Sequence, residues 1–261
     1  MRILKTLGGV LSIIGVIIGM VIIVMGLGMP TRQVFTANFQ IEMSDKITQE
    51  SIKPQEQELP TGKRSDWNLL LVNAQHHFSD GNVELGNLNN GYQLDKRIIP
   101  YWNKLNEAAQ QAGITLTMVS AFRSVATQKS LVQQNIQANI NAGMSEEEAT
   151  KATMSVMQEP GSSEHATGLA FDVVGTDYFN RTDSSQLLVA EFSNDISAKW
   201  LATKAPEFGF ILRYPKGRED ITGIDFEPWH FRFVGVEVAQ FITKHNLTLE
   251  EYIDLLEKAG R

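Results

Sequence analysis

The chain has 261 residues, of which 43% are hydrophobic, and this is enough for one sizeable domain or two small ones. It carries 23 Lys and Arg against 30 Asp and Glu, a formal net charge of −7 at pH 7, so nucleic acid is not expected as a partner. It has no cysteine, which excludes disulfides, thiolate metal ligands, a cysteine nucleophile and a lipid-modified cysteine anchor. Any bound metal must therefore be held by His, Asp and Glu.

The N-terminal part is strongly apolar. Residues 6–31 contain no charged side chain and consist mostly of Ile, Val, Leu, Met and Gly, and about 20 such residues span a bilayer as a helix. The run is longer than the apolar part of a secretory signal and lacks a convincing Ala-x-Ala site, which favours an uncleaved anchor over a cleaved signal. Arg2 and Lys5 precede it, so the positive-inside rule places residues 1–5 in the cytoplasm. We expect residues 6–30 to be one transmembrane anchor and the rest to be extracytoplasmic.

A polar segment, residues 31–66, follows the apolar run. It contains Pro54 and Pro60 within a dense mixture of Lys, Glu and Gln. Such a composition buries little apolar surface and predicts a solvated stalk. The apolar run of residues 67–73 then has the length of a strand, and we place the start of a folded domain, residues 67–261, at that point.

Hydrophobic periodicity divides this domain into helices and strands. Helices are predicted at residues 96–111, 125–141, 145–158, 187–205, 236–244 and 249–258. Strands are predicted at residues 114–119, 169–174, 208–212 and 226–234. Two of the helices begin with a capping box, formed by Ser145 with Glu148 and by Thr248 with Glu251.

Two segments combine a histidine with a carboxylate beside an apolar strand. In the first, His165 follows a Gly/Ser-rich approach, and Asp172 lies inside the apolar run of residues 169–174. An ionised aspartate in such a run needs a cation or several hydrogen-bond donors. In the second, Glu227 stands three residues before His230, which leads into an aromatic and β-branched run.

On spacing alone, two interpretations of these residues remain open. They supply two imidazoles and one carboxylate as ligands and a second carboxylate as a base, which is the inventory of a catalytic zinc site. A lone histidine is nonetheless more often a core or surface residue, and the adjacent His76 and His77 are interpreted as surface histidines. The chain has no His-Glu-x-x-His helix, so it is not that class of metallopeptidase. Arg123 stands at the end of a predicted strand, where it either points into a cleft or forms a surface ion pair.

These residues also carry a resemblance to a known family. The chain resembles the VanY family of D-alanyl-D-alanine carboxypeptidases in three motifs, Ser163-x-His165-x-x-Gly168-x-Ala170-x-Asp172, Glu227-Pro-Trp-His230-Phe-Arg232 and Ser120-Ala-Phe-Arg-Ser124. The resemblance extends from about residue 67 to about residue 256. The family comprises zinc enzymes related to D-Ala-D-Ala dipeptidases and to L,D-carboxypeptidases that trim bacterial peptidoglycan. Phe122 is a departure, because the family usually has Tyr before the Arg, and it removes one hydroxyl from the substrate contacts.

The resemblance implies a role for each matching residue. It makes His165, Asp172 and His230 the zinc ligands and Glu227 the general base. It makes Arg123 the cation that stabilises the scissile carbonyl oxygen. These roles agree with general chemistry, because zinc lowers the pKa of its water, a carboxylate takes the proton, and a cation stabilises the tetrahedral oxyanion.

The resemblance also sets the expected fold and function. Ser163 and Gln128 match positions that contact the substrate. We expect an α+β domain whose small, mainly antiparallel sheet is flanked by helices, with the zinc site in a cleft. We expect a membrane-anchored, monomeric zinc metallocarboxypeptidase that removes the C-terminal D-alanine from peptidoglycan stem peptides or precursors. The alternatives are an L,D-carboxypeptidase or endopeptidase on the same substrates, and a non-catalytic zinc-stabilised cell-wall binding module. Retention of Glu227 and Arg123 favours the enzyme, because a structural zinc needs no base.

Overall fold

The computed structural model describes residues 59–261 except residues 80, 82, 155 and 156. The transmembrane anchor expected at residues 6–30 and most of the predicted stalk lie outside the described residues. Within the described part of the chain, no helix is long and apolar enough to cross a membrane. The described residues therefore comprise the predicted domain and the segment just before it.

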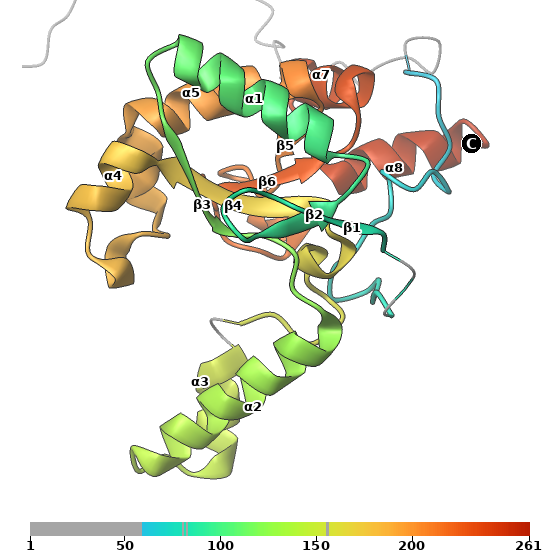
Figure 1. Ribbon diagram of the computed structural model, residues 1–261. Coiled ribbons are helices and arrows are strands. Elements are labelled where there is room, and N and C mark those ends of the chain that lie inside the picture. Colours follow the sequence, from blue (N-terminus) through green and yellow to red (C-terminus); the bar gives the residue numbers. More distant parts are fainter. Residues whose placement is uncertain (1–58, 80, 82, 155–156) are drawn as a thin grey trace, which may run out of the picture. The chain divides into compact units, whose positions relative to one another are not determined.

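A four-stranded antiparallel sheet lies at the centre of the domain, with the strand order β3-β4-β6-β5 (Figure 1). Its strands are β3 (Leu116–Ser120), β4 (Ala170–Gly175), β5 (Phe210–Leu212) and β6 (His230–Phe233). A separate antiparallel hairpin pairs β1 (Leu85–Asn87) with β2 (Gln93–Asp95). The predicted α+β class with an antiparallel sheet and flanking helices is thus confirmed.

The helices connect and flank these strands (Figure 1). They are α1 (Ile99–Gln111), α2 (Val125–Asn141), α3 (Glu146–Met154), α4 (Thr176–Arg181), α5 (Ile196–Lys204), α6 (Glu219–Thr222), α7 (Val236–Lys244) and α8 (Leu249–Lys258). Short 3-10 segments are η2 (Glu164–Thr167), η3 (Ser184–Gln186), η4 (Ala190–Asn194) and η5 (Ala205–Phe208). The two predicted capping boxes form, at the starts of α3 and α8.

The two faces of the sheet have different chemistry because side chains alternate along a strand. Phe171 on β4 pairs with Phe231 on β6, and both point into a core covered by α1 and α5. This core includes Leu94, Ile98, Trp102, Leu105, Met118, Phe171, Val173, Leu201, Phe210, Phe231 and Phe233. The neighbouring pair, Asp172 and His230, therefore lies on the opposite face. A second core packs α7 and α8 against Ile211 and Val234.

Three segments differ from the elements expected from sequence. Residues 67–73 form a turn at residues 67–68 followed by irregular backbone rather than a strand, because the carbonyls of Asn68 and Leu70 accept hydrogen bonds from Arg232 instead of pairing with a neighbouring strand. The helix expected at residues 187–205 is shorter. It begins only at α5, where the Asp195 side chain accepts from the amide of Ser197 and caps the helix. The β1–β2 hairpin falls in a stretch for which no strand was predicted.

The folded part of the chain also begins earlier than the expected boundary at residue 67. Leu59 is only 9% exposed and belongs to the core that packs α7 and α8. Arg261, the last residue, donates from Nε to the carbonyl of Gly62 at 2.9 Å and also contacts the carbonyl of Pro60. Residues 59–66, assigned to the stalk from their polarity, therefore pack against the end of the chain.

Candidate metal centre

Three segments that are far apart in the sequence meet in one row across the sheet. Ser120 at the end of β3 pairs with Asp172 on β4, and Asp172 pairs with His230 at the start of β6. Arg123 lies three residues after the end of β3, and Glu227 lies three residues before the start of β6. The antiparallel register therefore brings the three motifs singled out in the sequence to the same place.

His165, Asp172 and His230 form the one group among the described residues whose ligand atoms lie close enough to hold a metal ion. Their candidate donor atoms all lie within 4.8 Å of one another, and all three residues are buried. Asp172 Oδ2 is 3.4 Å from His165 Nε2, and Asp172 Oδ1 is 3.0 Å from His230 Nδ1. The carboxylate thus stands between the two imidazoles, which belong to η2 and β6 rather than to flanking helices.

A tight turn positions His165. It lies in η2, and Gly168 closes this turn with a φ of 69°, in the left-handed region that favours glycine. A Cβ at Gly168 would also stand 2.8 Å from the backbone nitrogen of Asp95, so a larger residue would displace the turn. The outer ring nitrogen, His165 Nδ1, contacts the carbonyl of Ala121 at 2.8 Å. Because a carbonyl can only accept, the proton lies on Nδ1 and the lone pair of Nε2 faces Asp172.

The donor set fits zinc. In zinc sites, imidazole and carboxylate donors lie about 2.0–2.2 Å from the ion, so the ligand atoms stand close to one another, as they do here. Zinc-bound histidines also direct their second ring nitrogen at an acceptor. His165 directs Nδ1 at the Ala121 carbonyl, and His230 directs Nε2 at a carboxylate oxygen of Glu164, 3.6 Å away.

The charges around His230 favour a cation. Burial alone would lower the pKa of His230, but contacts with Asp172 and Glu164 raise it to about 10 in the metal-free protein. Burial alone would raise the pKa of Asp172, but His165 and His230 hold it below its usual range. Asp172 and Glu164 therefore stay ionised at neutral pH, and the negative charge of Asp172 attracts a cation to the metal-ligand atoms of the triad.

Glu227 lies beside the triad without belonging to it. Its Oε2 is 3.7 Å from His230 Nδ1, and its side chain is 25% exposed, more than those of the triad residues. Burial raises the pKa of the Glu227 carboxyl to about 7; His230 opposes this shift, whereas the negative charges of Asp172 and Glu164 add to it. A partly exposed carboxyl with a pKa near neutrality has the properties of a general base.

Arg123 adjoins the triad from the β3 side. Its backbone nitrogen donates to the carbonyl of His165 at 3.2 Å. Burial lowers the pKa of Arg123, and the nearby charge of Asp172 partly opposes this shift. Its Nε is buried and has no hydrogen-bond partner within the described residues, so it retains the capacity to donate to a further group. Of the two placements left open by the sequence, the structure agrees with the one beside the site.

The two residues expected to contact substrate are both buried, but the structure relates them to the triad less directly. Ser163 precedes η2, next to Glu164. Gln128 lies on α2 and donates from Nε2 to the carbonyl of Gln158 at 2.6 Å, while its Oε1 has no hydrogen-bond partner within the described residues. The nearby Tyr214 ring lies 4.9 Å from that of His230.

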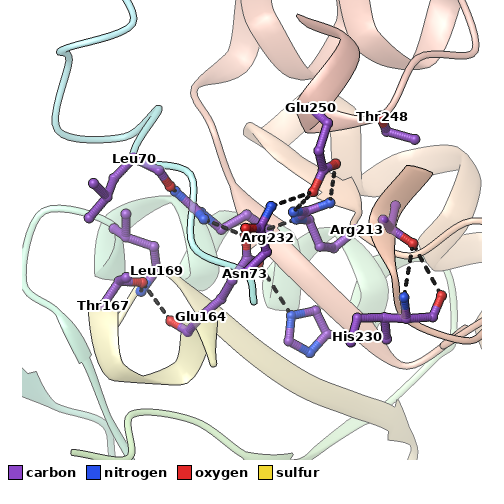
Figure 2. A network of polar contacts seen from close by, with 12 residues as sticks. Leu70, Asn73, Glu164, Thr167, Leu169, Arg213, His230, Arg232, Thr248 and Glu250 are labelled. Atoms are coloured by element: carbon purple, nitrogen blue, oxygen red, sulfur yellow. Dashed lines mark hydrogen bonds and ion pairs between the residues drawn. The ribbon is translucent and has the colours of Figure 1, made fainter. Parts of the chain in front are cut away.

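A buried ionic network beside the triad was not identified from the sequence (Figure 2). Glu164 is fully buried, and its Oε1 accepts from Arg213 Nε at 2.8 Å and from Arg232 Nη1 at 2.7 Å. Glu250 on α8 binds Arg213 through two further hydrogen bonds of 2.6 and 2.8 Å. Burial alone would raise the pKa of Glu164, but the two guanidinium groups hold it well below its usual range. The sequence did contain one signal, since Arg213 directly follows an apolar strand and Arg232 lies within one, and a buried arginine needs a partner.

An α+β fold with two imidazoles and a carboxylate around one point, a nearby free carboxyl and a nearby arginine defines the class of metallopeptidases. The family model described as VanY, D-alanyl-D-alanine carboxypeptidase, matches residues 91–236, a span that includes every predicted site residue. A D-alanyl-D-alanine carboxypeptidase of Enterococcus faecalis (strain ATCC 700802 / V583) is 34% identical over 206 residues, which are 77% of this chain and 72% of that protein. The chain belongs to the VanY family.

Solved structures agree with this assignment. A mutant of the vancomycin resistance D,D-pentapeptidase VanY from a VanB-type resistance cassette, in complex with Zn(II), has a TM-score of 0.60 and 34% identity, and the match covers 72% of this chain and 99% of that one. The LdcB LD-carboxypeptidase has a TM-score of 0.61 and 30% identity, and the match covers 72% and 86%. The predictions of a VanY-type enzyme and of zinc as its cofactor are confirmed.

Proposed function

We propose that this protein is a membrane-anchored zinc carboxypeptidase that removes the C-terminal D-alanine from peptidoglycan stem peptides or their precursors. One observation carries the proposal, namely that Asp172 and His230 pair across β4 and β6 with Glu227 and Arg123 at the ends of the adjoining segments. A purely structural metal site needs neither a free carboxyl nor an unpaired guanidinium N–H beside it. A non-catalytic binding module would use neither the Glu227 carboxyl nor the unpaired N–H of Arg123.

Each residue has a distinct chemical task in this proposal. His165 Nε2, an oxygen of Asp172 and His230 Nδ1 hold the metal. Zinc, when bound, acts as a Lewis acid on a water molecule and on the scissile carbonyl. Glu227 accepts the proton that the attacking water releases and passes it to the nitrogen of the departing D-alanine as the C–N bond breaks. Arg123 donates to the oxyanion that develops on the carbonyl oxygen, using the N–H that lacks a partner.

Substrate contacts are proposed for Ser163 and Gln128. The Oε1 atom of Gln128 is a buried acceptor without a hydrogen-bond partner within the described residues, and a peptide N–H would satisfy it. Phe122 supplies no hydroxyl to this region. If Ser163 and Gln128 contact only the substrate, their substitution should raise KM and leave zinc affinity unchanged.

A second candidate activity is that of an L,D-carboxypeptidase, which removes a single D-alanine from a tetrapeptide. It is favoured by one observation, because the fold matches the LdcB LD-carboxypeptidase with a TM-score of 0.61, as closely as it matches VanY with 0.60. The two activities share the metal, the base and the oxyanion donor. They differ in the configuration of the residue that precedes the scissile bond.

The deciding experiment uses two matched substrates. The purified protein is incubated with zinc and a muropeptide that ends in D-Ala-D-Ala, or with one that ends in a single D-alanine, and the product masses are measured. Loss of one alanine from the first substrate alone supports the proposed activity, and loss from the second alone supports the L,D-carboxypeptidase. If neither substrate loses mass while the protein holds zinc, the binding module is the correct function. Glu227→Gln serves as the inactive control.

The proposed topology follows from the sequence of the segment outside the described residues. Residues 1–5 lie in the cytoplasm, residues 6–30 cross the membrane once, and a stalk beginning at residue 31 carries the domain outside the cell membrane as a monomer. Peptidoglycan lies on that side of the membrane. The proposed location therefore gives the site access to its substrate.

A further inference from the structure

We propose that Glu164 is a positioning residue that keeps the imidazole of His230 in the tautomer whose Nδ1 lone pair faces the metal. This inference rests on the ligand role proposed above for His230. Glu164 immediately precedes His165 in the chain. Its carboxylate nonetheless has Arg213, Arg232 and His230 as its charged neighbours. Its side chain instead reaches the outer edge of the His230 imidazole, as the dashed line in Figure 2 shows.

The two oxygens of Glu164 have different partners. Oε1 accepts from both guanidinium groups, at 2.8 Å from Arg213 and 2.7 Å from Arg232. Oε2 has no hydrogen-bond partner within the described residues and lies 3.6 Å from Nε2 of His230, which also has none. Two buried polar atoms that lack other partners thus face each other, and a small approach of the ring would complete a hydrogen bond.

The chemistry of the pair determines the tautomer. A neutral imidazole carries one N–H and one lone pair, and an ionised carboxylate can only accept. The proton must therefore lie on Nε2 to satisfy Glu164. The lone pair is then left on Nδ1, which faces Asp172 Oδ1 at 3.0 Å and Glu227 Oε2 at 3.7 Å. The same arrangement, an acceptor behind each zinc-bound histidine, is provided for His165 by the Ala121 carbonyl.

The rest of the network fixes the carboxylate in place. Arg232 donates from Nη2 to the carbonyls of Leu70 at 2.7 Å and Asn68 at 3.2 Å, and Arg213 binds Glu250. Both guanidinium groups are fully buried and each contacts Oε1, so rotation of the carboxylate would break two charged hydrogen bonds. Oε2 is thereby kept pointing at His230 (Figure 2).

Substitution by glutamine should invert the tautomer rather than merely weaken the contact. A glutamine side chain has one accepting oxygen and one donating NH2 group. The two arginines can only donate, so they would retain the oxygen and turn the NH2 group toward His230. Nε2 would then have to accept, the proton would move to Nδ1, and the lone pair that binds the metal would be lost.

The test compares Glu164→Gln with Asp95→Asn. Asp95 is a fully buried carboxylate that accepts from Arg97 Nε at 2.9 Å, so its substitution breaks a similar ion pair without touching His230. Zinc affinity is measured by competition with a chelator, and the metal-free melting temperature is measured for each protein. Glu164→Gln should weaken zinc binding about 10–100-fold, as is typical when the outer partner of a zinc-bound histidine is lost. Asp95→Asn should lower the melting temperature and leave zinc affinity at the wild-type level, because the Asp95 carboxylate binds Arg97 rather than a zinc-bound histidine.

A spectroscopic measurement on the zinc-loaded protein addresses the tautomer directly. Nitrogen-15 NMR of wild type should show His230 protonated at Nε2, with a slowly exchanging proton that shifts in Glu164→Gln and not in Asp95→Asn. If Glu164→Gln does not fold, Glu164→Asp takes its place, because it keeps the charge for both arginines while its shorter side chain withdraws from His230. Wild-type zinc affinity in the folded variant would overturn the inference. If the wild-type protein itself failed to bind zinc, the ligand role proposed for His230 would be wrong instead.

Discussion

Asp172 and His230 face each other on neighbouring strands, and Asp172 Oδ1 lies 3.0 Å from His230 Nδ1 although 58 residues separate them in the chain. Their relation depends on the register of β4 and β6. A shift of one residue would turn Asp172 toward the core that contains Phe171 and would bring Phe231 to the site. The aromatic packing under the sheet therefore also maintains the geometry of the metal centre.

The first prediction concerns the ligands. His165→Ala or His230→Ala should reduce zinc affinity by more than the roughly 10–100-fold typical of a lost outer partner, because one of three direct ligands is removed. The measurement is zinc content after dialysis against a weak chelator. His77→Ala is the control, since His77 is exposed and its Nε2 contacts the carbonyl of Ala74. Full zinc occupancy in both ligand variants would contradict the assignment.

The second prediction separates the base from the ligand. Glu227→Gln should keep its zinc, because the side chain lies outside the triad, and the zinc-loaded variant should keep the melting temperature of zinc-loaded wild type. Its kcat should fall roughly 10²–10⁴-fold, the range for lost general acid–base catalysis. Asp172→Asn should instead lose zinc, because a neutral amide is a poor zinc ligand. An active, zinc-replete Glu227→Gln protein would rule out the role proposed for Glu227.

Local patterns in the sequence predicted much of the fold. The capping box of Thr248 and Glu251 marked the start of α8, and short runs of apolar, aromatic and β-branched residues predicted the strands that carry Asp172 and His230. The site residues could be identified because histidine and carboxylate recur at short spacing beside apolar runs. Each of these signals lies within a few residues of chain, which is the range over which sequence patterns are informative.

The buried ionic network could not be predicted, because its partners are distant in sequence. Glu164 is 49 residues from Arg213 and 68 from Arg232, and a charged residue in an apolar run indicates only that some partner exists. The segment of residues 67–73 was expected to be a strand for a related reason. Its apolar composition is typical of a strand, but two of its carbonyls accept hydrogen bonds from Arg232. Such a contact between distant residues cannot be predicted from local composition.

The third prediction concerns Arg123. Arg123→Ala should lower kcat about 10²–10³-fold, the effect of removing one donor to a developing oxyanion, while zinc content stays at the wild-type level. Arg181→Ala is the control, because Arg181 binds Asp195 away from the metal centre. Kinetics with a D-Ala-D-Ala peptide, together with metal analysis, test the difference. A kcat equal to that of the control would remove Arg123 from the mechanism.

The fourth prediction concerns topology. Protease added to intact cells or protoplasts should release the domain, because the polar segment after residue 31 is expected to be exposed outside the membrane. Cleavage is expected before residue 59, since Leu59 and the residues after it pack against the domain. The fragment is detected by mass spectrometry of the supernatant. Protection in intact cells with cleavage only after lysis would show that the orientation is reversed.

The fifth prediction concerns pH. Burial raises the pKa of Glu227 to about 7 in the metal-free protein, and a carboxyl acts as a base only when deprotonated. The positive charge of bound zinc favours the ionised form and lowers this pKa. The kcat/KM value should therefore rise with pH about tenfold per unit and level off above a midpoint between about 4.3, the unperturbed pKa of Glu, and about 7.

The same shift has a consequence for stability that can be measured separately. Between the unfolded pKa of about 4.3 and the folded pKa of about 7, the folded metal-free protein binds more protons at Glu227 than the unfolded chain does. The contribution of Glu227 to stability must then decrease as pH rises through this window, and Glu227→Gln should abolish that decrease. Carbon-13 NMR of the side-chain carboxyl, with and without zinc, gives both pKa values. A Glu227 carboxyl that titrates near 4.3 without zinc would contradict the burial argument. If kcat/KM of Glu227→Gln still rose with pH in the acidic range, the rise would have to come from another group.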